Sequence, residues 1–342
     1  MDKRKAGPLE VSAIGMGCMG FSHGYGRIPD EADSIEAIRS ALDLGCTFFD
    51  TAEVYSPNLE GLGHNERIVG KALKGGRSGV VLATKLFVAS GEPERDGSLR
   101  QTLRRHLADS LRRLGTDWVD LYYLHRVNPD IPVEDVAFEM GRLAEEGLIR
   151  GWGLSAVSGE TAARAHAVYP LAAVQNLYNM FERGCEEDVF PFCLGHGIAV
   201  VAFSPVASGL LSGKITAATK FEEKDDVRNW VPQLARENIQ GNQPMLDVVA
   251  SFARRKQATC AQIALAWMLC KYPNAVPIPG SRNKERIREN LEAWKVQFTP
   301  EEFRDLEAAL AACTVHGHRG HVETAGSAKR LVEEHEARAG RR

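Results

Sequence analysis

Short apolar runs rich in β-branched residues alternate along the chain with segments of helical periodicity. Residues 33–44 repeat Ile35, Ile38 and Ala41 on one helical face, and residues 103–114 repeat leucine at helical spacing. Such alternation predicts βα units around a parallel sheet. The predicted strands are residues 14–18, 47–51, 80–85, 119–125, 151–155, 173–177, 199–204 and 275–278.

Eight strands with crossover helices can close into a barrel. The competing architecture, an open doubly wound sheet, needs a strand–turn–helix glycine fingerprint. Gly15, Gly17 and Gly20 have the GxGxxG spacing, but residues 21–26 open a helix poorly and no acidic residue ends a second strand at the required distance. We therefore predict an α/β fold, a single (β/α)8 TIM barrel over residues 1–314.

Two segments interrupt the βα rhythm. Residues 205–245 form a long connection after the seventh strand, and connections of that length are usually functional or disordered. We predict that this loop is a flap beside the site. Residues 315–342 contain few apolar positions and predict a separate C-terminal tail, mobile or acting as a lid.

Composition narrows the function further. The 42 basic and 45 acidic side chains give a net charge of −3, too balanced for a nucleic-acid or anionic-lipid surface. The seven cysteines form no CxxC pair and no apolar run could cross a bilayer, so we expect a soluble cytoplasmic protein that binds a small molecule. We predict no metal site, because His316, His318 and His321 lie in a glycine-rich tail without helical spacing.

Polar side chains end successive predicted strands, where a (β/α)8 barrel carries its site. Asp50 ends the second strand, Tyr55 follows in the loop, Lys85 ends the third strand and His125 the fourth. Each residue alone is explained by a helix cap, a solvated charge or a structural histidine. Their joint placement at one rim instead indicates a catalytic site. Loops at residues 21–29, after Lys85, at 126–130, the flap and the tail are expected to form its walls.

The motifs at these positions resemble those of the aldo-keto reductase superfamily. They are FDTAEVY at 49–55, GHNE at 63–66, VGKAL at 69–73, TK at 84–85, DLYYLH at 120–125, GLS at 153–155, VQ at 174–175, AFSP at 202–205, GLLSGK at 209–214, IPGS at 278–281 and EN at 289–290. The likeness spans about residues 9–298. A narrower resemblance is to the pyridoxal-reductase-like (YakC-type) branch.

The resemblance implies NADPH-dependent reduction of aldehydes and ketones by Asp50, Tyr55, Lys85 and His125. Tyr55 would donate the proton as hydride reaches the carbonyl carbon. A free tyrosine has a pKa of about 10, so a neighbouring Lys85 ammonium is expected to make the phenol more acidic. Asp50 would keep Lys85 charged, and His125 would orient the carbonyl.

The preference for NADPH over NADH is argued from the last predicted βα junction. We expect Ser281 to cap a helix whose first amides attract anions, with Arg282 and Arg286 four positions apart beside it. The resemblance implies that Ser281, Arg282 and Arg286 hold the adenosine 2′-phosphate and that Glu289 and Asn290 contact adenine. The other implied cofactor-binding residues are Ser155 and Gln175 at the nicotinamide amide, Phe203 stacked on its ring, Ser204, Val206, Ser208 and Leu210 along the pyrophosphate, and Lys214 and Gly280 nearby.

Two other functions remain open from the sequence. A lysine that ends a barrel strand can attack a carbonyl as a neutral amine, so Lys85 would also suit a Schiff-base lyase. A non-catalytic NADPH-binding regulatory subunit would carry the same residues. Neither the physiological substrate nor the oligomeric state can be read from the chain.

Overall fold

Eight parallel strands form the centre of the molecule in the computed structural model, which describes residues 1–57, 61–221, 223 and 226–320. Their order in the sheet follows the chain from β3 to β10. The strands are β3 (Met16–Gly17), β4 (Phe48–Asp50), β5 (Val81–Leu86), β6 (Val119–Leu124), β7 (Ile149–Ser155), β8 (Ala173–Leu177), β9 (Ala199–Phe203) and β10 (Ala275–Pro277).

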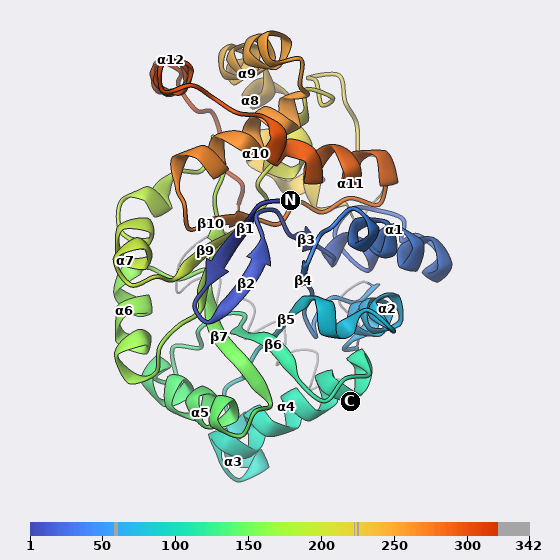
Figure 1. Ribbon diagram of the computed structural model, residues 1–342, viewed down its shortest axis with the longest axis vertical. Helices are drawn as coiled ribbons and strands as arrows, with labels where there is room; N and C mark the ends of the chain where they lie inside the picture. Colours follow the sequence, from blue (N-terminus) through green and yellow to red (C-terminus); the bar gives the residue numbers. More distant parts are fainter. Residues whose placement is uncertain (58–60, 222, 224–225, 321–342) are drawn as a thin grey trace.

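Backbone hydrogen bonds join the first and last of these strands. The Gly15 amide donates to the Pro277 carbonyl over 2.9 Å, and the Gly17 amide donates to the Pro279 carbonyl over 3.4 Å. In Figure 1 the strands form an inner ring with the helices around it. The predicted (β/α)8 architecture is confirmed, and every predicted strand overlaps an observed one.

The helices lie between the strands or follow the last one. They are α1 (Glu31–Asp43), α2 (His64–Leu73), α3 (Glu92–Asp96), α4 (Leu99–Leu114), α5 (Val133–Glu145), α6 (Gly159–Val168), α7 (Val189–Gly195), α8 (Arg236–Gly241), α9 (Gln243–Lys256), α10 (Cys260–Lys271), α11 (Lys284–Leu291) and α12 (Pro300–Ala311). All of these helices except α3 contribute buried apolar side chains to one large core that they share with the strands. Among the described residues, none of the helices has the length and apolarity needed to span a membrane.

An antiparallel hairpin that the sequence analysis missed precedes the barrel. Its strands β1 (Lys3–Ala6) and β2 (Leu9–Ser12) place Leu9 and Val11 in one buried cluster with Val81 and Leu121. Val81 and Leu121 lie near the starts of β5 and β6, so the hairpin covers the amino ends of the strands. It lies over the centre of the ring in Figure 1. Three of the four residues of β1 are charged, so a search for apolar alternation could not recognise the strand.

The segment 205–245 is more regular than a single long loop. It contains 3-10 helices at Ala207–Ser212, Val227–Trp230 and Pro232–Leu234, then α8, and α9 already begins at Gln243. Each of the four helices that precede α9 in this segment has six residues or fewer. Such helices are too short for a helical period to be recognised in the sequence.

The described part of the predicted tail is attached to this segment. The His316 amide donates to Asn242 Oδ1, and Asn242 Nδ2 donates to the His316 carbonyl, each over 2.8 Å. The Gln233 amide donates to the His318 carbonyl over 3.1 Å. Residues 321–342, including His321, lie outside the described residues, so the tail boundary at 315 stays a prediction.

Candidate active site

A cavity of about 1660 Å³ opens at the carboxyl ends of the strands. Asp50, Tyr55 and His125 line one end of it, and Arg286 and Glu289 of α11 line the other. Residues of every predicted wall contribute, because Phe21, Phe87, Arg126, Val227 and Arg319 also line the cavity.

The four predicted catalytic residues come together at the inner end. Lys85 Nζ forms a buried ion pair with Asp50 Oδ1 and donates to the Thr51 carbonyl over 2.8 Å. The same Nζ lies 3.4 Å from the Tyr55 hydroxyl. The Tyr55 and His125 rings meet edge to face with centroids 5.7 Å apart. Asp50 ends β4, Lys85 belongs to β5 and His125 follows β6, so neighbouring strands position them.

Lys85 is held as an ammonium although it is fully buried. Burial, the largest single influence, lowers the pKa of Lys85, but Asp50 and Tyr55 together outweigh it and the pKa is raised. Asp50 is fixed in turn by Gln175, whose Nε2 donates to Asp50 Oδ2 over 2.8 Å. The site therefore keeps a positive charge beside the phenol.

The expectation of an acidic phenol is wrong for the protein without ligand. Burial raises the pKa of Tyr55 by more than the Lys85 ammonium lowers it, so the pKa lies above its usual value. Tyr55 thus keeps its proton near neutral pH. Burial, Arg126 and Lys85 all lower the pKa of His125, well below its ordinary value, so this imidazole is neutral.

Most of the predicted cofactor-binding residues line the cavity. They are Ser155, Gln175, Phe203, Ser204, Val206, Ser208, Lys214, Gly280, Ser281, Arg282, Arg286, Glu289 and Asn290. Leu210 is the exception, since its side chain is fully buried in the core and is not among the lining residues. The chain turns at Ser208 and Gly209, which have positive φ values of 54° and 98°, and this turn directs the apolar Leu210 inward.

The predicted cap of the last helix is also corrected. Asn283, not Ser281, precedes α11, and its side chain accepts from the Arg286 amide over 2.9 Å. Ser281 Oγ instead accepts from the Asn283 amide over 3.2 Å. The helix therefore begins two residues later than expected. Asparagine caps a helix about as well as serine does, so the capping interaction is kept.

Arg282 and Arg286 differ in their surroundings. The Arg282 guanidinium donates to the carbonyls of Tyr25, over 2.6 Å, and of Arg27, so it ties this end of the cavity to the loop after β3. Arg286 is exposed and lines the cavity with its side chain uncommitted to any carboxylate among the described residues.

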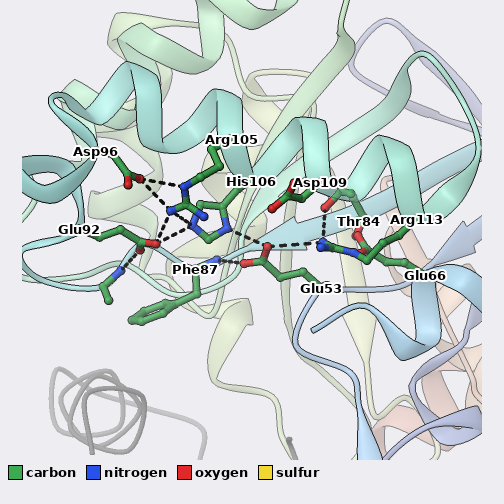
Figure 2. Close-up of polar contacts among 12 residues, drawn as sticks. Glu53, Glu66, Thr84, Phe87, Glu92, Asp96, Arg105, His106, Asp109 and Arg113 are labelled. Atoms are coloured by element: carbon green, nitrogen blue, oxygen red, sulfur yellow. Dashed lines mark hydrogen bonds and ion pairs between the residues drawn. The ribbon is translucent and has the colours of Figure 1, made fainter. Parts of the chain in front are cut away.

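A network of buried charges links α4 to the loop that follows β5 (Figure 2). His106 of α4 contacts Glu53 Oε2 through Nδ1 over 2.8 Å and Glu92 Oε1 through Nε2 over 3.1 Å. The second oxygen of Glu53 accepts from the Phe87 amide over 2.9 Å, and that of Glu92 from the Ala89 amide over 3.0 Å. Both carboxylates therefore hold the loop that follows Lys85.

The network makes His106 an imidazolium. Burial lowers the pKa of His106, but Glu53 and Glu92 outweigh burial and raise the pKa to about 10. A charged imidazole can donate from both nitrogens, which matches its two carboxylate partners. No sequence pattern predicts this cluster, because residues 53, 92 and 106 are far apart in the chain and each residue type is common on helix surfaces.

Comparison with known proteins places the chain in a family. The model of the aldo/keto reductase family matches residues 13–311. A protein of Glycine max described as probable aldo-keto reductase 1 is 36% identical over 315 residues, which are 91% of this chain and 89% of that protein. The chain therefore belongs to the aldo/keto reductase family.

Solved structures of similar proteins agree with this assignment. The glycerol dehydrogenase AKR11B4 from Gluconobacter oxydans has a TM-score of 0.79 and 29% identity, over 92% of this chain and 96% of that one. An aldo/keto reductase from Klebsiella pneumoniae in complex with NADP and acetate has a TM-score of 0.69 and 29% identity, over 92% and 97%. Another from Klebsiella pneumoniae, in complex with NADPH, has a TM-score of 0.70 and 27% identity, over 95% and 100%.

Proposed function

We propose that the protein reduces aldehydes and ketones to alcohols with NADPH, with Tyr55 as the proton donor. The single observation that carries the proposal is the contact of the Tyr55 hydroxyl with a Lys85 ammonium paired to Asp50, at the inner end of the large cavity. Membership of the aldo/keto reductase family and the NADP and NADPH complexes of the Klebsiella pneumoniae relatives support the same reaction.

The cavity fits a dinucleotide in its size and its donors. Ser208 Oγ is buried and has no hydrogen-bond partner among the described residues, although it lies at the cavity wall. A buried hydroxyl without a partner favours a polar ligand group at that place. Ser204 and Ser208 would hold the phosphates, Ser155 and Gln175 the nicotinamide amide, and Phe203 its ring. Arg286 with Ser281 would hold the 2′-phosphate.

Bound NADPH would supply a hydride to the carbonyl carbon of the substrate. The chain's own residues supply the rest. Tyr55, which is protonated, gives its proton to the carbonyl oxygen, so the hydride and the proton together complete the alcohol. Lys85 stabilises the tyrosinate that is left. His125, as a neutral imidazole, hydrogen-bonds the carbonyl oxygen and sets its approach.

The assay is reduction of 4-nitrobenzaldehyde, followed by NADPH absorbance. We expect Tyr55→Phe to lower kcat by about 10³-fold, within the range of general acid catalysis, and to leave the NADPH dissociation constant nearly unchanged. Tyr169→Phe, outside the cavity, is the matched control and should retain wild-type activity. Wild-type turnover by the Tyr55 variant would defeat the assignment of the proton donor.

The same assay separates the two other functions. A non-catalytic regulatory subunit would bind NADPH without consuming it. A Schiff-base lyase needs a neutral amine, and the raised pKa of Lys85 beside Asp50 disfavours one. Borohydride should therefore trap no substrate on Lys85.

We also infer a cytoplasmic location from the cysteines. None of the seven forms a disulfide within the described part of the chain, as expected in a reducing compartment.

A further inference from the structure

The inner end of the cavity carries one positive charge more than the four catalytic residues require. Lys85 and Asp50 neutralise each other as an ion pair. Tyr55 and His125 are both neutral near pH 7, because the pKa of the first is raised and that of the second is lowered. The remaining charge belongs to Arg126, which directly follows His125 and lines the same cavity.

Within the part of the chain that the structure describes, Arg126 has no acidic partner to balance its charge. Its Nη1 donates to the His125 carbonyl over 2.6 Å and to Ser155 Oγ over 3.1 Å, and both acceptors are neutral. Among the described residues, none of the carboxylates forms an ion pair with it, and its Nε and Nη2 donate no hydrogen bond. The guanidinium is only partly exposed, and burial lowers its pKa.

A half-buried guanidinium with free donors calls for an anion, and planar carboxylates fit two of its donors at once. Its position next to His125 puts that anion beside the reacting carbonyl rather than at the α11 end, where the cofactor phosphates are proposed to lie.

We propose that Arg126 is a specificity-determining residue that binds the carboxylate of an oxo acid, so that the preferred substrates are aldehydes or ketones carrying a carboxylate. This inference rests on the proposed function, because it names the substrate class of the same site. Arg126 holds the carboxylate through Nε and Nη2 while Nη1 keeps its contacts with the His125 carbonyl and Ser155.

The test compares carboxylates with their neutral amides of the same shape. Phenylglyoxylate, 3-carboxybenzaldehyde and 4-carboxybenzaldehyde place the carboxylate at three distances from the carbonyl, and each is paired with its amide. The wild-type protein is expected to favour the acid in at least one pair by about 10- to 100-fold in kcat/KM, as a charge-assisted contact predicts.

Variants of Arg126 distinguish carboxylate binding from a purely structural role of this side chain. Arg126→Met should abolish the preference for the acid: kcat/KM for the acid should fall about 10- to 100-fold, mainly through KM, and kcat/KM for the amide should fall by much less. Arg126→Lys, which keeps the charge, should restore part of the preference. Arg164→Met is the control, because it removes the same charge from an exposed ion pair with Glu134 on the outside of the barrel.

A binding measurement does not depend on turnover. Benzoate should bind the wild-type protein in the presence of NADP+, followed by tryptophan fluorescence, and should lose at least about tenfold in affinity in Arg126→Met, with benzamide as the neutral control. Equal kcat/KM for acids and amides in the wild type, or an equal loss for both in Arg126→Met, overturns the inference. Failure of every carbonyl compound to consume NADPH overturns the proposed function instead, and the benzoate result then still decides whether Arg126 binds a carboxylate.

Discussion

Tyr55 shows how burial and charge compete at a single side chain. Burial raises the pKa of its hydroxyl, and the Lys85 ammonium 3.4 Å away lowers it by a smaller amount. The raised pKa suits a proton donor, because the Tyr55 hydroxyl keeps its proton over the whole neutral pH range. We therefore expect the rate of carbonyl reduction to stay level between about pH 6 and about pH 9. A loss of reduction centred near pH 7 in the pH–rate profile would contradict the proton state assigned to Tyr55 or His125.

Asp50→Asn tests the charge on Lys85. Because burial lowers the pKa of Lys85 and Asp50 is its main compensation, removing the carboxylate should lower that pKa and leave a neutral amine as the pH rises. We expect kcat to fall at least about tenfold at pH 8, with a loss that grows with pH. The measurement is the pH–rate profile, with Asp109→Asn, a surface residue paired to Arg112, as the control. A profile parallel to that of the wild type would show that Asp50 does not set the charge of Lys85.

Arg286→Ala tests the choice of cofactor. The side chain is exposed and lines the α11 end of the cavity, so its loss should weaken NADPH binding by about tenfold and leave NADH binding unchanged. Lys284→Ala is the control, because Lys284 pairs with Glu36 and does not line the cavity. Fluorescence titration gives both dissociation constants. Unchanged affinity for NADPH would refute the 2′-phosphate site.

At the scale of elements, His106 links α4 to the loops that carry the site. Its two carboxylate partners hold the backbone of Phe87 and Ala89, and Glu53 lies between Asp50 and Tyr55 in the chain (Figure 2). The pair is almost fully buried, with 6% of the His106 side chain and 2% of the Glu53 side chain exposed. Removing one partner from such a pair leaves an uncompensated buried charge.

His106→Leu should therefore lower the free energy of unfolding by about 3 kcal/mol. The folded pKa of about 10 lies above the unfolded value of about 6.5, so the contribution of the charge is full below pH 6.5 and is lost as the pH rises through 10. Urea unfolding at pH 6 and pH 10 should show the larger difference from the wild type at pH 6. Arg105→Met is the control, since Arg105 also contacts Glu92 but is 42% exposed, and should cost less than about 1 kcal/mol. An equal loss at both pH values would refute the charged state of His106.

The sequence predicted the elements that repeat and missed those that depend on distant partners. Strand positions and their polar ends could be predicted, because a buried parallel strand needs an apolar run and the barrel places its site at the strand ends. Three features could not be predicted: the β1–β2 hairpin, the cap by Asn283 and the inward turn at Leu210. Each depends on a packing partner that is distant in the chain or on a shift of one or two residues in where an element begins. The same holds for the sign of the Tyr55 pKa, which depends on how deeply the phenol is buried.

At the scale of the molecule, the barrel closes where Gly17 and Gly280 let the backbones of the first and last strands approach each other. A Cβ on Gly17 would lie 2.8 Å from the Ile278 carbonyl oxygen, closer than packing allows. We expect Gly17→Ala to lower the free energy of unfolding by about 2 kcal/mol, as overpacking does. Gly79→Ala, where a Cβ would meet nothing within 4 Å, is the control and should change stability by less than about 0.5 kcal/mol. Thermal or urea unfolding measures both, and equal stability of the two variants would show that the seam tolerates a side chain.

The β1–β2 hairpin lies on the face of the barrel opposite the cavity and holds the first residues of the sequence there. Arg4 donates to the Leu269 carbonyl over 2.6 Å and to the Ala275 carbonyl over 2.8 Å, so the first residues are fastened to the end of α10 and the start of β10. A fusion partner or a solid support joined through Met1 would therefore sit behind the barrel. The immobilised protein would present its cavity to the surrounding solution, with its entrance unobstructed by the attachment.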